Sequence, residues 1–130
     1  MGRKQKFYDT AADSLIEFAK YQFWLNQPLE DKATRRSHFE AAKRSGLKVK
    51  ELEYEPLDPI CEEWWEWFCE LNSGRQSNGM GANVLGWGEI KAWTELTGNK
   101  PTPFDIEVIK RVDIAFIESS VDEQKNKKGN

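Results

Sequence analysis

The chain has 130 residues, of which 32% are charged and 38% hydrophobic, and its formal net charge is −3. This length is typical of one small domain, and no segment approaches the apolar length of a membrane span. The two cysteines, Cys61 and Cys69, are eight positions apart, about 12 Å along a helix, which is too far for a disulfide. The single histidine, His38, lies in a different segment, so we expect no metal site and no cofactor.

The charges divide the chain into two unlike parts. Residues 1–50 carry 11 Lys/Arg against 6 Asp/Glu, whereas residues 51–130 carry 8 against 16. Eight acids and no base lie between Glu51 and Glu70. This division favours a protein partner steered by charge, or the packing of the two parts on each other. Free nucleic acid is disfavoured, because the acidic part would repel phosphate.

Hydrophobic periodicity predicts an all-α fold of about five helices in a small single domain, residues 1–121. Within it we expect basic N-terminal helices over residues 1–50 and a tryptophan-rich helical core over residues 56–120. The tail, residues 122–130, has no apolar residue and is predicted to be disordered.

The N-terminal part is predicted to contribute two helices and a linker. Apolar residues at helical spacing favour a first helix over residues 10–25, with Thr10 near its start. A second helix is expected from residue 28 or 29 to about 45, and its thin apolar stripe places it on the surface. Residues 48–57 alternate charged and apolar side chains, which fits a short strand or, as we expect, an extended linker.

The third helix has the strongest start signal, because Asp58 is an N-cap acid and Pro59 takes the first helical position. It is predicted to end at Gly74. A Gly/Asn-rich loop over residues 73–86 is expected to follow.

Two further helices are predicted after this loop. The fourth is short, spans about 88–97, and is stopped by Gly98. The last begins at Thr102, with a proline in its first turn and Asp105 as the acid of a capping box, and runs to about Ser120.

Asp113 is the polar residue that most needs explanation, because it falls on the apolar side of the last helix. A buried carboxylate requires a partner, and the planar guanidinium of Arg75 suits one. We therefore predict a structural ion pair between Arg75 and Asp113. An exposed acid at the edge of the stripe is the alternative.

The aromatic residues at helical spacing are predicted to lie in the core: Trp64, Trp67, Phe68, Trp93 and Phe116. Trp65 lies off this stripe and Trp87 borders the glycine loop, so both are predicted to be exposed anchors for a partner. The predicted partner-binding set adds the acidic strip Glu62, Glu66 and Glu70.

No catalytic arrangement is present in the sequence. The segment Gly79-Met-Gly81 lacks the Gly-Lys-Ser/Thr ending and the preceding strand of a phosphate-binding loop. Glutamates along one helix usually form a solvated face rather than a glycosidase pair, and no Ser/His/Asp or Cys/His set accompanies them. We expect no enzymatic activity.

Several pieces follow one another in a definite order between Pro56 and Phe116. The first piece is an acidic-aromatic helix that ends in Leu71, and Arg75 and a glycine-rich loop follow it. Next come the segment from Trp87 to Trp93 and the tripeptide Leu96-Thr97-Gly98. The last piece is a helix that starts with proline and an aromatic residue and ends with Asp113 to Phe116. In this order the pieces resemble the tail assembly chaperones of long-tailed bacteriophages and prophages, small proteins encoded between the tail tube and tape measure genes. The upstream segment Arg35 to Ala42 is similar to the corresponding region of these chaperones.

The resemblance implies a non-enzymatic protein of the host cytoplasm that coats the tape measure protein, recruits tail tube subunits to it, and is absent from the mature virion. Homo-oligomerisation stays open, and neither nucleic acid nor a membrane is an expected partner. A structural head–tail connector or minor tail protein of the virion is the first alternative. The second is a small phage inhibitor of a host defence protein, acting through the acidic helix.

Overall fold

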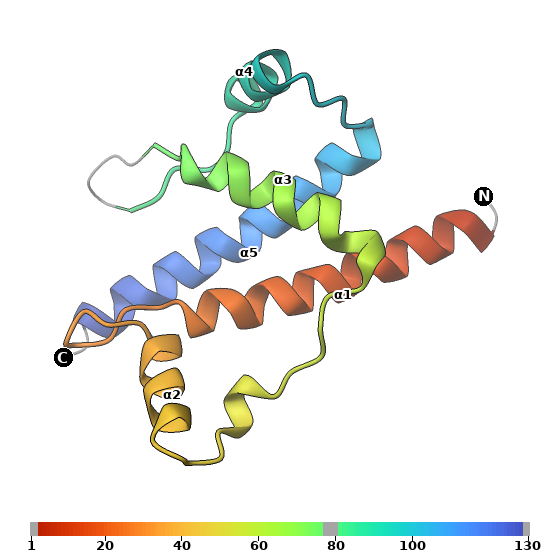
Figure 1. Ribbon diagram of the computed structural model, residues 1–130. Helices are drawn as coiled ribbons and strands as arrows, with labels where there is room; N and C mark the ends of the chain where they lie inside the picture. Colours follow the sequence, from red (N-terminus) through yellow and green to blue (C-terminus); the bar gives the residue numbers. More distant parts are fainter. Residues whose placement is uncertain (1–2, 77–80, 129–130) are drawn as a thin grey trace.

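The computed structural model describes residues 3–76 and 81–128 (Figure 1), and this part of the chain contains five α-helices and no β-strand. The helices are α1 (Arg3–Leu25), α2 (Arg35–Arg44), α3 (Glu62–Ser73), α4 (Trp87–Thr97) and α5 (Pro103–Lys128). Two short 3₁₀ helices, η1 (Lys50–Leu52) and η2 (Pro59–Cys61), lie in the connection between α2 and α3. The predicted all-α architecture is confirmed for the described residues.

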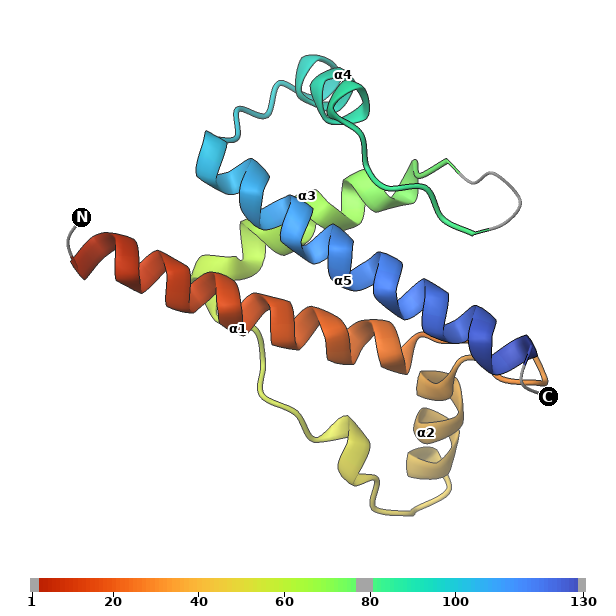
Figure 2. The ribbon, with the colours of Figure 1, turned by 180° about the vertical axis from the view of Figure 1, so that it is seen from behind.

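The two long helices, α1 and α5, pack side by side in the same direction, and α3 lies across both of them (Figures 1 and 2). Near the start of each long helix, the rings of Tyr8 and Phe104 lie 6.3 Å apart. Near their other ends, Gln27 Nε2 donates to Ser119 Oγ at 3.1 Å. Contacts that advance together along both helices establish the parallel arrangement.

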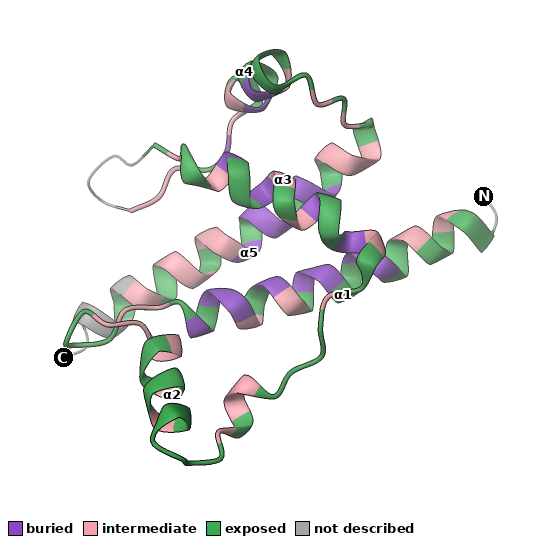
Figure 3. Cartoon of the chain, viewed as in Figure 1, coloured by how far each residue is buried: buried purple, intermediate pink, exposed green. Residues whose placement is uncertain are grey.

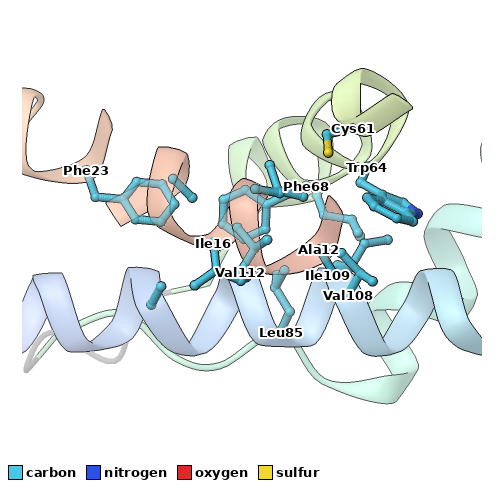
Figure 4. Close-up of a cluster of buried hydrophobic side chains, with 14 of the residues drawn as sticks. Ala12, Ile16, Phe23, Cys61, Trp64, Phe68, Leu85, Val108, Ile109 and Val112 are labelled. Carbon is cyan, nitrogen blue, oxygen red and sulfur yellow. The ribbon is translucent and has the colours of Figure 1, made fainter. Parts of the chain in front are cut away.

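The core lies where α1, α3 and α5 meet (Figure 4). Ile16 of α1, Phe68 of α3 and Val112 of α5 belong to one cluster of buried side chains, which Leu85 joins from the connection before α4. Burying each large apolar side chain stabilises the fold by about 1.5–3 kcal/mol relative to exposing it. This cluster therefore holds the three helices together.

Helix α2 lies apart from this core and buries no residue (Figure 3), as predicted for a surface helix. It begins at Arg35, several residues later than the sequence predicts. The reason is local: Thr34 caps the helix by accepting from the Ser37 backbone N–H at 3.1 Å. Before it, Leu29 N donates to the carbonyl of Ala33 at 2.8 Å, so the preceding residues form a turn.

Helix α1 corrects the sequence prediction in the opposite direction, because it begins at Arg3 rather than near Thr10. The Thr10 hydroxyl donates to the carbonyl of Lys6 at 2.9 Å inside the helix and does not cap it. The linker prediction is confirmed for residues 48–57, which contain only the short η1 and no strand.

The predicted caps of the later helices are confirmed. Asp58 Oδ1 accepts from Ile60 N at 3.0 Å at the start of η2, which leads directly into α3. Thr102 and Asp105 form a reciprocal capping box with distances of 2.8 and 3.1 Å. Gly98 ends α4 with a φ of 76°, a left-handed conformation that glycine adopts without steric cost.

The predicted disorder of the tail requires correction, because α5 continues to Lys128 instead of ending near Ser120. Glutamate, glutamine and lysine favour helix, and extending an existing helix by another residue is far easier than nucleating one. Residues 129–130 lie outside the described part, as do residues 77–80 of the predicted Gly/Asn-rich loop. No helix among the described residues is long and apolar enough to cross a membrane.

Candidate functional site

A buried ion pair between Arg75 and Asp113 joins the end of α3 to the middle of α5, as the sequence predicts. The two side chains are 7% and 5% exposed. Arg75 Nε also donates to Asn72 Oδ1 at 2.7 Å, Nη1 donates to the carbonyl of Asn83 at 2.6 Å, and Nη2 makes the contact with Asp113. The guanidinium carbon lies 4.4 Å from the centre of the Phe116 ring. Every guanidinium nitrogen therefore has a partner, which offsets the cost of burying the charge.

The same carboxylate also positions the segment that precedes α4. Asp113 Oδ2 accepts from Leu85 N at 2.9 Å, and Lys110 Nζ donates to the carbonyl of Leu85 at 3.3 Å. The side chain of Leu85 is fully buried in the core. Leu85 is thus fixed to α5 through its side chain and both of its backbone polar groups.

Exposed apolar side chains flank this anchored residue. Val84 is 61% exposed and Trp87 is 66% exposed, and Ile114 on α5 is 57% exposed. Lys110 lies one helical turn before Ile114, and its Nζ is 4.3 Å from the centre of the Trp87 ring. We call Val84, Trp87, Lys110 and Ile114 the Trp87 surface. An exposed tryptophan on a fixed backbone segment is typical of a protein-binding anchor.

Trp65 is not part of such a surface, which corrects the prediction that it is an exposed anchor. Its ring packs edge-on against Phe18 at 5.5 Å, lies 5.8 Å from Phe23, and stacks on Phe68 at 6.0 Å. The apolar face of α3 is wider than the sequence stripe indicates, because α1 covers the flank on which Trp65 lies. Trp65 is a packing residue at the α1–α3 interface.

The predicted core aromatics do pack in the core, to different extents. Trp64, Phe68 and Trp93 are buried, whereas Trp67 and Phe116 are partly buried against the cluster. The Trp64 indole donates to Asp105 Oδ1 at 2.8 Å, so the residue that caps α5 also satisfies a buried tryptophan.

The acidic strip of α3 divides into two groups. Glu62 and Glu66 are exposed. Glu70 Oε1 instead accepts from the Trp93 indole at 2.6 Å and so connects α3 to α4. Glu70 is also exposed, but its carboxylate is engaged by Trp93, so Glu62 and Glu66 are the members of the predicted partner-binding set without a described side-chain bond of this kind.

Both cysteines are free thiols. Cys61 is buried and donates to the carbonyl of Ala11 at 3.3 Å, whereas Cys69 is exposed. Loss of solvation beside neighbouring protein atoms raises the pKa of both thiols, although part of the Cys69 side chain is exposed, and the negative charges of Asp58 near Cys61 and Glu66 near Cys69 raise it further. Among the described residues, no group of His, Cys, Asp and Glu side chains is arranged to hold a metal ion.

The sequence did not identify four members of the site: Val84, Leu85, Lys110 and Ile114. Val84 and Leu85 are adjacent apolar residues in a glycine-rich segment, and nothing in the sequence indicates which of them is buried. The charge of Lys110 beside an apolar stripe fits a solvated residue equally well. The placement of this segment is set by the hydrogen bond from Leu85 N to Asp113, two residues that are 28 positions apart in the sequence.

The model of the phage tail assembly chaperone family matches residues 41–118, which are 78 of the 130 residues. The chain belongs to this family. The segment that matches the chaperone family contains α3, α4, most of α5, the Arg75–Asp113 pair and the whole Trp87 surface. Comparison with curated proteins and with solved structures gave no match.

Proposed function

We propose that this tail assembly chaperone is a non-enzymatic protein that binds the tape measure protein and the tail tube subunits in the host cytoplasm and is absent from the finished tail. The observation that carries the proposal is the Trp87 surface, an exposed apolar patch that lies entirely within the family-matched segment. Exposed aromatic residues of this size favour association with other proteins.

The chemistry of the Trp87 surface suits the apolar stripe of a helix. Trp87, Val84 and Ile114 supply apolar area, and Lys110 supplies a cation beside the Trp87 ring. Amphipathic helices bind such surfaces through apolar anchors, while charge at the rim sets their register. The family resemblance implies a long, helical tape measure protein, which would offer apolar helical stripes of this kind.

Affinity capture of the tape measure protein of the same phage tests this proposal. Wild-type chain should capture it, and Trp87→Ala should reduce the captured amount by about tenfold, in the range of an interface hot spot. Phe7→Ala is a matched control, because Phe7 is also an exposed aromatic residue but lies outside the family-matched segment. Equal capture by wild type and Trp87→Ala would remove the Trp87 surface from the binding site.

Mass spectrometry of purified phage particles separates an assembly factor from a permanent component. The chain is expected in lysates that contain unfinished tails and not in finished particles. A fixed number of copies in each particle would instead make the chain a head–tail connector or a minor tail protein.

A further inference from the structure

A groove runs between α1 and the extended segment that leads to η2, away from the Trp87 surface. A hollow of about 840 Å³ is lined by α1 and residues 54–59. A second hollow of about 390 Å³ continues it past residues 50–53. The two hollows share Tyr21 and Tyr54, and we call them together the α1 groove.

Aromatic rings form the floor of the α1 groove. Tyr54 packs edge-on against Tyr21 at 5.4 Å and against Phe18 at 6.2 Å. Each phenol hydroxyl is held: Tyr21 Oη donates to the carbonyl of Glu51 at 2.6 Å, and Tyr54 Oη accepts from Arg36 at 3.2 Å. With the hydroxyls held in this way, the ring faces are what the floor offers to an occupant. Aromatic faces attract ammonium and guanidinium groups and the aliphatic stems that carry them.

Acidic side chains line the walls of the α1 groove. The two hollows are lined by six carboxylates and one ammonium group: Asp13, Glu17, Glu51, Glu53, Glu55, Asp58 and Lys50. Besides Arg36, two further cations flank the walls, Arg111 at 2.7 Å from Asp13 and Lys20 at 3.6 Å from Glu17. These two pairs are exposed, and exposed pairs contribute only about 0–1 kcal/mol, so an incoming cation can replace them.

The α1 groove and the Trp87 surface lie on different sides of the molecule. In Figures 1 and 2, α4 lies beyond α3 and α5 at one end, whereas α2 and the segment leading to η2 lie beyond α1 at the other. One copy of the chain therefore has room for a partner at each end at the same time.

We propose that the α1 groove is a second docking site, for a lysine- or arginine-bearing segment of a partner protein. The aliphatic stem of a basic side chain lies on the Tyr21 and Tyr54 rings, and its cation is held by the surrounding carboxylates. This inference rests on the proposed function, because a chaperone that joins two tail components needs two separate binding surfaces. Its test needs neither component.

Peptide titration of the full chain tests the α1 groove directly. The probe is an alanine–lysine helix of about 18 residues, and the comparison peptide carries glutamate at every lysine position. Binding is followed by anisotropy of a dye on the peptide. The groove variant is the double substitution Glu17→Lys with Glu55→Lys. The matched control is Glu95→Lys with Glu118→Lys, which changes the net charge equally at exposed positions of α4 and α5 outside the groove.

The lysine peptide should bind the wild-type chain at least about tenfold more tightly than the glutamate peptide, and added salt should weaken it. The groove variant should lose about tenfold in affinity, while the control variant with the same net charge should lose less than about threefold. Circular dichroism and melting confirm that each variant is folded.

Two results would overturn the docking site: equal losses in both double variants, or no preference for the lysine peptide. Concentration-dependent light scattering without peptide, abolished by the groove variant, would also overturn it, because the occupant would then be a second copy of the chain. None of these results bears on capture of the tape measure protein through Trp87, so the two proposals fail separately.

Discussion

Asp113 holds three parts of the molecule in place. Its carboxylate pairs with the guanidinium of Arg75 and accepts the backbone N–H of Leu85. The end of α3, the segment before α4 and the middle of α5 are therefore joined through one buried side chain. The orientation of Trp87 depends on this contact, because Leu85 lies two residues before it.

Replacing Asp113 with alanine should lower the free energy of unfolding by about 3–5 kcal/mol, because the buried guanidinium of Arg75 loses its counter-charge. Chemical denaturation measures the change. Asp13→Ala is the matched control, since its pair with Arg111 is exposed and the expected loss is at most about 1 kcal/mol. Similar losses of unfolding free energy in the two variants would show that the buried pair stabilises the fold no more than the exposed pair does.

Replacing Trp65 with alanine should also destabilise the fold, by about 2–4 kcal/mol, because three aromatic neighbours lose packing contacts. Trp87→Ala should change the free energy of unfolding by no more than about 0.5 kcal/mol, as expected for an exposed residue. Thermal melting of both variants distinguishes the roles. A stable Trp65→Ala protein would return that residue to the list of partner-binding candidates.

The two thiols should react with a disulfide reagent in separate phases. Exposed Cys69 reacts first, and buried Cys61 reacts only through unfolding. Since the pKa of Cys69 is raised, its thiolate fraction at neutral pH is small, and its rate should keep rising as the pH increases through the usual thiol range. Absorbance of the released reagent, with Cys69→Ser as control, records both phases. If both thiols reacted in a single fast phase, the burial of Cys61 would be contradicted.

At the scale of the elements, the sequence predicted helix identity well wherever a cap and an apolar stripe coincide. The start at Asp58 and the capping box at Thr102 are observed, because both depend on contacts within three residues. The extra length of α5 was missed because its polar end has no apolar periodicity, and the early start of α1 was missed because Tyr8 packs against Phe104 only in the folded chain. The Trp65 error had another cause, since the covering of that flank by α1 is a tertiary contact.

Helix α2 should be the least protected helix against hydrogen exchange. It buries no side chain, whereas α3 contributes Trp64, Phe68 and Leu71 to the core. Opening α2 therefore exposes little apolar area and costs little free energy. Hydrogen exchange measured by mass spectrometry should show that α2 amides exchange through local opening. The amides of α3 should exchange almost as slowly as global unfolding allows. Equal protection of the two helices would mean that α2 is held by contacts stronger than those described.

At the scale of the whole molecule, the sequence predicted the family and the general role but neither proposed binding surface in full. Trp87 was identified because it borders the glycine segment, whereas Val84 and Ile114 join it only after folding. The α1 groove combines residues about 40 positions apart, Glu17 and Glu55 among them, and no local pattern reveals that proximity. The opposite charges of the two parts were visible in the sequence, but the exposed Arg111–Asp13 pair, which joins a base of the acidic part to an acid of the basic part, was not.

The proposed role of this chaperone is to cover the tape measure protein in several copies before the tube assembles. Light scattering of the complex purified after co-expression of the two proteins tests this most directly. The predicted result is a soluble complex whose mass corresponds to several copies of this chain on each tape measure protein. A tape measure protein that stays insoluble, with this chain recovered alone, would contradict the account.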